Sequence, residues 1–429
     1  MSGYWTDLRN WVLRDPGKLI RYIVLFICSI VVIVQLYECF SKLRNPPIST
    51  HSYYNLNDTI EMPAVTICRE PPYKENVLAD IFDDPNCYHP KYTQCWTSFP
   101  FDKIPLIDVF INGTFEQSET FQLYGYNNEK TNVDITSSIH FNLGRCYTIR
   151  AKFPSKRVSK NSGFSMMLRH HVLKKDSLQY EAEPGWHLYV HDSKEEFTEI
   201  NMKASGRVEY VFAEIDEEIE IKLQSQHFKT VPTIDYACDS SKGYSDFRCG
   251  ETCIWKEVTD LSDCTGPWMP SVQKKSCESY DSMKNLTVSY QTKYNNEDNP
   301  SCECVEPCYS KIFSTYIQNR KSFIQPTPTT QVWVYYTSKL ITMIEDRPSY
   351  DSTQFIADMG GTLGFLLGLS VLGLIGILEH LTLLIFGGII KKIQLKEEKR
   401  LQTEKEEEER RSNNSDTTLD VSSIAKNRF

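Results

Sequence analysis

The chain has 429 residues, a net charge of −9 and a mean hydropathy of −0.41, so most of it is too polar to lie within a lipid bilayer. The acidic balance and the lack of a basic patch with interleaved aromatic residues argue against nucleic acid as a partner. The sequence also has no phosphate-binding loop, nucleophile elbow or zinc-ligand spacing, so we predict no enzyme and no metal or cofactor site.

The first apolar run covers residues 22–40 and has no charged side chain between residues 23 and 34. A helix needs about 20 mostly apolar residues to cross a bilayer. Arg14, Lys18 and Arg21 precede the run, as basic residues precede a signal peptide, but no small-residue cleavage site follows it. We therefore predict an uncleaved transmembrane helix at 22–40 after a cytoplasmic N-terminus at 1–21, with a removed signal peptide as the alternative.

The cysteines indicate which part of the chain lies outside the cell. Of 14 cysteines, Cys28 and Cys39 lie in the first run, the other twelve lie between residues 68 and 308, and the C-terminal tail has none. An even number confined to one loop is typical of a disulfide framework formed in an oxidising compartment. Three N-glycosylation sequons lie in the same loop, at Asn57, Asn112 and Asn285. Residues 41–354 are therefore predicted to form an extracellular, disulfide-rich, glycosylated domain.

Apolar and polar residues alternate in three segments of this domain, at residues 186–190, 207–212 and 218–223. Alternation with period two predicts half-buried strands. Residues 236–308 are dense in cysteine and poor in apolar side chains, so we expect that part to depend on disulfides for its stability.

Two pairs of histidines, His170 with His171 and His187 with His191, offer a residue type that binds metal ions or titrates near neutral pH. His187 and His191 fall in a strand-like stretch and would not share a helix face. We predict no metal ion there.

The second apolar run extends from about residue 355 to residue 390. Its last 32 residues, 359–390, would span roughly 48 Å as one helix, against about 30 Å of hydrocarbon. An interruption would absorb part of that excess, and the triplet Gly368-Leu369-Ser370 is the natural place for it. We predict a second transmembrane segment at 355–390.

Basic residues on the outer sequence sides of both runs, Lys391 and Lys392 among them, place both termini in the cytoplasm. Lys42 and Arg44, on the other side of the first run, oppose that orientation. The cytoplasmic tail at 391–429 mixes acidic and basic residues at helical spacing around residues 396–411, which predicts a solvent-exposed helix.

Asp358 and Glu379 lie 21 residues apart in the second run, which places one acid near each face of the membrane. Acids at such positions line cation pathways, or they are interfacial groups that only reach toward the headgroups. Gly360, Gly364 and Gly368 form a ridge of small residues. Such a ridge serves helix packing, and it also suits a pore at which several helices meet.

Several separated motifs resemble those of one family. Residues 62–68 read Met-Pro-Ala-Val-Thr-Ile-Cys, residues 143–148 read Leu-Gly-Arg-Cys-Tyr-Thr, and residues 358–370 contain the acid and the glycines. Two cysteine motifs lie between them, Cys249-x3-Cys253 and Cys302-x-Cys304-x3-Cys308. In these motifs, over residues 20–390, the chain resembles the degenerin/epithelial sodium channel (amiloride-sensitive sodium channel) family, and most closely its insect pickpocket branch.

The resemblance implies an α+β membrane protein with two transmembrane helices and a large palm, thumb and finger domain outside the membrane. It implies a trimer, either of this chain or with related subunits. It also implies six disulfides: Cys68–Cys146, Cys87–Cys95, Cys238–Cys308, Cys249–Cys304, Cys253–Cys302 and Cys264–Cys277. A further pair of the family would use a position that holds Ser262 here.

The resemblance also implies an ion pathway. Gly368, Leu369 and Ser370 match the selectivity filter, Asp358 would concentrate cations at the outer mouth, and Glu379 would lie near the inner end. Ala357 matches the position at which bulky side chains hold degenerin channels open. The expected function is that of a plasma-membrane channel subunit, permeable to sodium ions, sensitive to amiloride and gated by a ligand or another stimulus.

Two departures from the family pattern keep an alternative open. The family's cytoplasmic His-Gly motif is absent from residues 1–21, and the acid that the family has six residues after the filter serine is replaced by Gly376. The alternative is an auxiliary or non-conducting two-span subunit, or a chemoreceptor protein. A purinergic-type trimer shares the two-span topology but not these cysteine and Gly-x-Ser motifs.

Overall fold

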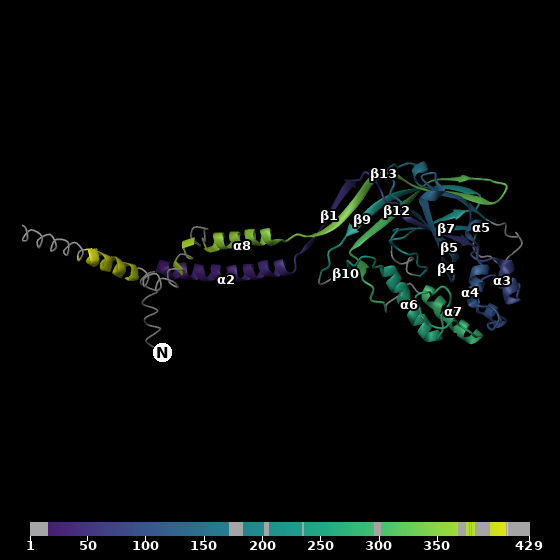
Figure 1. Cartoon of the computed structure of the whole chain (residues 1–429), viewed down its shortest axis with the longest axis horizontal. Coiled ribbons are helices and arrows are strands. Elements are labelled where there is room, and N and C mark those ends of the chain that lie inside the picture. The colour runs from purple at the N-terminus through teal and green to yellow at the C-terminus, as the bar shows by residue number, and fades with distance from the viewer. Residues whose placement is uncertain are drawn as a thin grey trace, which may run out of the picture. The chain divides into compact units, whose positions relative to one another are not determined.

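The computed structural model describes residues 16–170, 183–200, 206–233, 236–295 and 302–367, together with parts of 375–410. The chain divides into two compact units. One is Ile48–Ser349, and the other combines Met1–Pro47 with Tyr350–Phe429. Figure 1 labels the elements of both units.

A six-stranded sheet forms one layer of the Ile48–Ser349 unit (Figure 1). Its strand order is β12 (Tyr309–Ser322), β9 (Glu217–Lys229), β13 (Thr329–Pro348), β6 (Phe164–Arg169) and β3 (Phe121–Tyr126), and β1 (Ile48–Leu56) also pairs with β13. β9 and β13 run parallel, and the other pairs are antiparallel. The 20-residue strand β13 therefore connects the whole layer.

A five-stranded antiparallel sheet forms the second layer. Its order is β4 (Val133–His140), β5 (Gly144–Ala151), β2 (Ala64–Glu70), β7 (Gly185–His191) and β8 (Glu209–Glu214). The three strands predicted from alternation are confirmed as parts of β7, β8 and β9, although β8 begins two residues later than the pattern indicated.

The two sheets share one apolar core. Along β9, Ile219, Ile221 and Leu223 are buried while the charged residues between them stay partly exposed, as the alternation requires. They pack in one cluster with Leu188 of β7 and Val334 of β13. Burial of each such side chain stabilises the fold by about 1.5–3 kcal/mol, so this core holds the two layers together.

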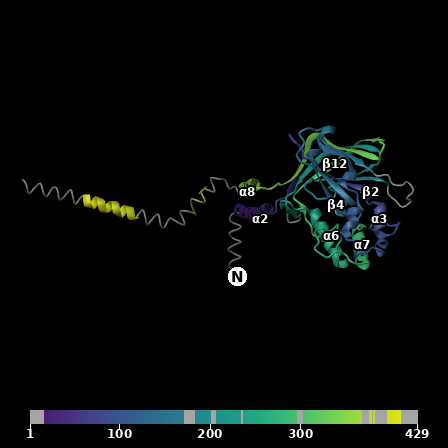
Figure 2. The ribbon, with the colours of Figure 1, turned by 45° about the vertical axis from the view of Figure 1, so that its right-hand side comes forward.

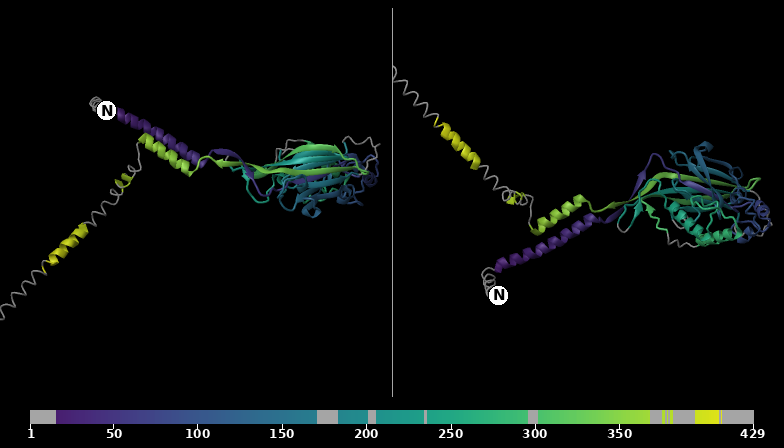
Figure 3. Two further views of the ribbon diagram at one scale, coloured as in Figure 1. Left: turned by 90° about the horizontal axis from the view of Figure 1, so that it is seen from above. Right: turned by 60° about the horizontal axis from the view of Figure 1, so that its bottom comes forward.

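Four helices and a short 3₁₀ turn form a second core beside the sheets, beneath them in the view of Figure 1 and forward in Figure 3, right. They are α3 (Glu75–Phe82), the turn η1 (Thr93–Thr97), α4 (Leu106–Asn112), α6 (Asp246–Ser262) and α7 (Tyr280–Asn295). Figure 2 shows α3, α6 and α7 on the same side of the sheets. The cysteine-dense part of the chain thus buries apolar faces of α6 and α7 as well as forming disulfides.

Six disulfides join the twelve cysteines between residues 68 and 308 in the same pairs that the resemblance implies. Cys68–Cys146 links β2 to β5, and two bonds tie α6 to the segment that leads into β12. Ser262, at the position where the resemblance implies a further cysteine, donates its buried hydroxyl to the Val258 and Cys264 carbonyls at 3.1 Å each.

In the other unit, α2 (Pro16–Arg44) and α8 (Ser352–Leu367) lie side by side (Figures 1 and 3). α2 extends past both ends of the predicted 22–40 helix, and among the described residues one helical stretch, Phe26–Arg44, is long and apolar enough to cross a membrane. Large side chains such as Phe26 and Ile33 are 68% and 67% exposed on it. So much exposed apolar surface is typical of a helix that contacts lipid or other helices.

Much of the second apolar run, including the interruption expected at residues 368–370, lies outside the described residues. In the tail, residues 395–408 form an exposed helix, as predicted.

Candidate functional site

The start of α8 carries the expected gating and pore-mouth positions. Asp351 precedes the helix, and its Oδ1 accepts a hydrogen bond from the Gln354 backbone N–H at 2.8 Å, which caps the helix N-terminus. Phe355 packs edge-on against Phe40 of α2, with ring centroids 5.0 Å apart. These contacts fix where α8 begins and which of its faces meets α2.

Asp358 lies one turn further along α8 and is partly buried. Its Oδ1 accepts a hydrogen bond from Gln354 Nε2 at 3.2 Å. The buried side chain of Tyr350 lies close to Asp358 and Cys39. Ala357 is exposed beside it. The neighbours of Asp358 within the chain are thus the Gln354 amide and the Tyr350 phenol, and neither is a cation.

The glycines that follow have open space around them within the chain. A Cβ added to Gly360 or Gly361 would meet no atom of this chain within 4 Å. Packing against α2 within one chain therefore does not explain why these two positions are glycine. The remaining predicted pathway residues, Gly368, Leu369, Ser370 and Glu379, lie outside the described residues.

The predicted glycosylation sites are accessible to different degrees. Asn112 at the end of α4 and Asn285 on α7 are exposed, and Asn57 after β1 is partly buried. The hydroxyl-bearing residues of the last two sequons, Thr114 and Thr287, are buried.

His170 and His187 both contact Glu70, through its backbone and its side chain respectively, and His191 contacts Thr66. His191 Nε2 lies 2.9 Å from Thr66 Oγ1, His187 Nε2 lies 3.1 Å from Glu70 Oε2, and His170 Nε2 lies 3.0 Å from the Glu70 carbonyl. His171 lies outside the described residues.

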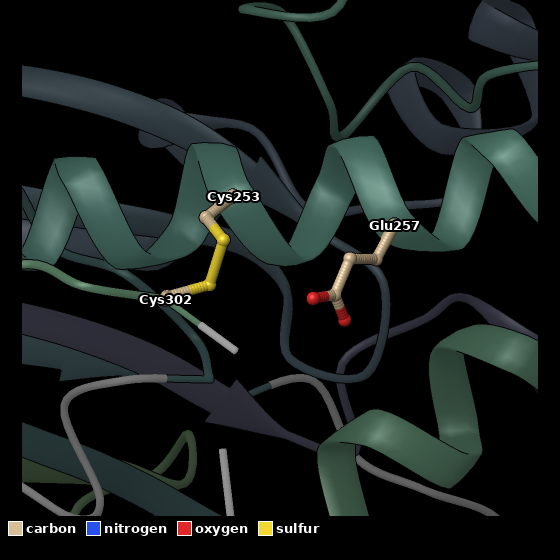
Figure 4. Close-up of side chains that lie close together, drawn as sticks. All are labelled: Cys253, Glu257 and Cys302. Carbon is tan, nitrogen blue, oxygen red and sulfur yellow. A yellow bond between two sulfur atoms is a disulfide. The ribbon is translucent and has the colours of Figure 1, made fainter. Parts of the chain in front are cut away.

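Among the described residues, one group of potential metal ligands converges, formed by Cys253, Glu257 and Cys302 (Figure 4). The two sulfurs are bonded to each other, so neither is a thiolate that could bind a metal. Glu257 pairs with Lys293 of α7 at 2.5 Å. The group is thus a disulfide next to an ion pair that joins α6 to α7.

Glu199, a buried acid that no sequence motif marks, connects the helices to the five-stranded sheet. Glu199 is 2% exposed, and its carboxylate accepts hydrogen bonds from the backbone N–H groups of residues 141, 142 and 143 at 2.8–3.1 Å. The Tyr290 hydroxyl of α7 donates to it at 2.6 Å. Burial raises the pKa of Glu199, while these four donors oppose the rise. Glu199 therefore joins the β4–β5 turn to α7.

A second buried acid, Glu251 of α6, lies close to Glu199. Burial, followed by the nearby Glu199 carboxylate, raises the pKa of Glu251 well above its usual value. The sequence did contain a signal, because Glu251 falls four residues after Phe247 and three before Ile254, on the apolar face of the helix. Nothing comparable in the sequence marks Glu199.

We expect Glu251 to make the folded protein less stable as pH rises. Because its pKa is higher when folded than when unfolded, folding takes up a proton between the two values, so this contribution is complete at acid pH and is lost as pH rises. Glu251→Gln should flatten the fall in thermal midpoint between pH 5 and pH 8, measured on the detergent-solubilised full chain. Asp260→Asn, at an exposed acid of the same helix, is the control; an unchanged slope in Glu251→Gln would contradict the assignment.

The described residues combine a disulfide-rich domain of mixed helix and sheet with one helical stretch that is long and apolar enough to cross a membrane. The family model "Amiloride-sensitive sodium channel" matches residues 8–380. The chain belongs to this family, and the resemblance inferred from its motifs is confirmed.

Three curated relatives are similar to parts of the chain. Degenerin del-1 of Caenorhabditis elegans is 22% identical over 61% of this chain and 44% of its own length. Pickpocket protein 19 of Drosophila melanogaster is 30% identical over 37% of this chain and 34% of its own. Degenerin-like protein unc-105 of C. elegans is 22% identical over 64% of this chain and 35% of its own length. The matches thus span less than half the length of each relative.

A solved structure of a proton-activated chloride channel aligns with 86% of this chain and 99% of its own, at 9% identity. The TM-score of 0.35 is too low for that likeness to bear on the fold.

Proposed function

We propose that this chain is a subunit of a cation channel in the plasma membrane, permeable to sodium ions, sensitive to amiloride and opened by a ligand or another stimulus. The observation that carries the proposal is the family match, which continues through residue 380 and so includes the segment from Asp358 to Ser370. In this proposal, residues 22–40 and 355–390 span the membrane, residues 41–354 lie outside, and both termini are cytoplasmic.

The proposed ion pathway begins at Asp358, crosses a constriction formed by Gly368, Leu369 and Ser370, and leaves past Glu379. Rings of acidic side chains attract cations, and backbone carbonyls at a constriction replace part of the water around the ion. Rings require several copies of the helix, so we propose a trimer of this chain or of this chain with related subunits. The open space around Gly360 and Gly361 leaves room for neighbouring helices.

Two-electrode recording from oocytes tests the proposal. The chain is expressed alone and with related subunits, sodium is exchanged for potassium, and amiloride is added. We expect an inward current that follows the sodium gradient and is blocked by amiloride. A chain that reaches the surface and passes no current with any partner would contradict the proposal.

Asp358→Asn tests whether the negative charge of Asp358, rather than the shape of its side chain, raises the sodium conductance. We expect the single-channel sodium conductance to fall by roughly half at low ionic strength, where an unscreened carboxylate concentrates cations most strongly, and by less at high salt. Asp358→Glu, which keeps the charge, is the control. If Asp358→Asn and the unchanged chain have equal conductance at low salt, the assignment of Asp358 to the ion pathway is wrong.

A second candidate function, that of an auxiliary subunit which does not conduct by itself, is favoured by Gly376 and by the missing His-Gly motif in residues 1–21. It predicts that Gly368 and Ser370 tolerate bulky replacements without change in the current of a mixed channel. Loss of that current would favour the conducting subunit.

A further inference from the structure

A cavity of about 770 Å³ lies in the Ile48–Ser349 unit, at residues that neither the predicted pore nor the disulfides use. Its lining comes from the end of β2, from β7 and β8, from the C-terminal end of α7, and from loop residues that include His89, Lys91 and Leu143. The volume is that of pockets that hold small organic molecules.

One carboxylate opens into this cavity. Glu70, the last residue of β2, has a side chain 19% exposed, and its Oε2 lies 3.1 Å from His187 Nε2. His187 Nδ1 lies 2.9 Å from the Tyr210 hydroxyl, so both ring nitrogens of His187 have partners. Among the described residues, Oε1 of Glu70 has no hydrogen-bond partner within the chain.

Aromatic rings surround that carboxylate. The rings of Tyr189 and Tyr210 lie 5.3 Å apart between centroids, and the His187 ring stacks 5.8 Å from Tyr210. Tyr294 of α7 lines the same cavity. Burial raises the pKa of Tyr189, Tyr210 and Tyr294, and the charge of Glu70 adds to the rise in each, which places all three phenols near this carboxylate in their neutral form.

Neither His89 nor Lys91, which also line the cavity, places a positive charge beside Glu70. Burial lowers the pKa of His89 to about 3, so this ring is neutral. Its Nδ1 accepts from the Lys91 backbone N–H at 3.0 Å, and its Nε2 donates to the Asn142 carbonyl at 3.0 Å. Lys91 is exposed at the rim, with its Nζ 5.3 Å from the Tyr92 ring. The interior thus presents one carboxylate, with Oε2 on the His187 ring and Oε1 open, beside the rings of Tyr189, Tyr210 and Tyr294.

We infer that this cavity binds a small organic ammonium ion with an apolar body. Aromatic faces attract cations through their quadrupoles, and a carboxylate that is partly removed from water adds a charge-assisted hydrogen bond. Pro72, Leu143 and Val208 offer the apolar body its contacts. The negative charge of the Glu70 carboxylate would repel an anionic ligand. A bound ligand would touch both β7–β8 and α7.

Calorimetric titration of the full chain in detergent tests the inference with a matched pair of probes. These are 2-phenylethylammonium and its neutral counterpart 2-phenylethanol, which have similar size and apolar surface. We expect the ammonium ion to bind at least tenfold more tightly than the alcohol. Equal affinities, or no measurable binding of either probe at millimolar concentration, would overturn the inference without the need for any variant.

Substitutions then assign the site. Glu70→Gln should weaken binding of the ammonium ion at least tenfold and leave the alcohol unchanged, whereas Asp134→Asn, at an exposed acid of the same sheet, should change neither. Tyr210→Phe should retain the affinity for the ammonium ion because the ring remains, and Tyr210→Leu should lose it. Thermal unfolding of each variant shows whether it is folded. Full affinity in folded Glu70→Gln would place the ligand elsewhere and overturn the inference.

The test does not depend on conduction. If the chain binds the ammonium ion but carries no current, only the channel proposal is contradicted. If it carries a current but does not bind the ammonium ion, only the inferred ligand site is contradicted.

Discussion

A chain with Ala357 replaced by tryptophan is expected to carry a standing sodium current in the absence of any stimulus. Ala357 is exposed within the single chain, next to Asp358 in the first turns of α8. In the proposed trimer, small side chains here let neighbouring helices close together, and an indole would oppose that closure. A rise of about tenfold in resting current corresponds to a shift of roughly 1.4 kcal/mol between closed and open states.

The measurement is amiloride-blockable resting current in oocytes, divided by surface expression and recorded with the required partner subunits. Ile356→Trp is the matched control, because Ile356 is already large and is 65% exposed at the adjacent helix position. Ala357→Val should give an intermediate current. If Ala357→Trp reaches the surface and stays silent, or if Ile356→Trp gives the same current, the gating role of Ala357 is wrong.

Local patterns in the sequence were sufficient to predict local structure. The alternation at residues 218–223 predicted part of β9, and the charge pattern of the tail predicted an exposed helix. The even number of cysteines predicted a disulfide framework, but twelve cysteines allow many pairings. The pairs themselves came from the family resemblance, since no property of spacing specifies that Cys68 pairs with Cys146 across 78 residues.

What the sequence did not predict depends on contacts between distant segments. The parallel pairing of β9 with β13 joins residues more than 100 positions apart, and no local pattern encodes it. Glu199 looks like an ordinary surface acid in the sequence until the β4–β5 turn and Tyr290 meet around it. Glu70 becomes a candidate ligand group only when β7, β8 and α7 enclose it. For the candidate pore, Ala357 and Asp358 are placed on α8, while the filter triplet remains a prediction from the family.

Trp268→Ala is expected to cause a large loss of stability in the Ile48–Ser349 unit. Trp268 is 2% exposed, and its ring centroid lies 4.4 Å from that of Phe141, 5.1 Å from that of Phe110 and 5.7 Å from that of Tyr290. It therefore joins the β4–β5 turn, α4 and α7 in one cluster. Truncation of a buried tryptophan costs about 3–5 kcal/mol, so we expect the thermal midpoint of the detergent-solubilised chain to fall by roughly 5–15 °C.

Gly266 provides an independent test of this packing. A Cβ at Gly266 would lie 2.3 Å from atoms of the Trp268 ring, so Gly266→Ala forces the ring to move and should destabilise the protein by about 1–3 kcal/mol. In a chain that already carries Trp268→Ala, the added methyl group of Gly266→Ala has room. Most of the destabilisation caused by Gly266→Ala should then disappear. Trp268→Phe, which keeps an aromatic ring, should lose less than Trp268→Ala. Additive effects of Gly266→Ala and Trp268→Ala would mean that the two residues do not touch, because residues in contact couple in a double-mutant cycle.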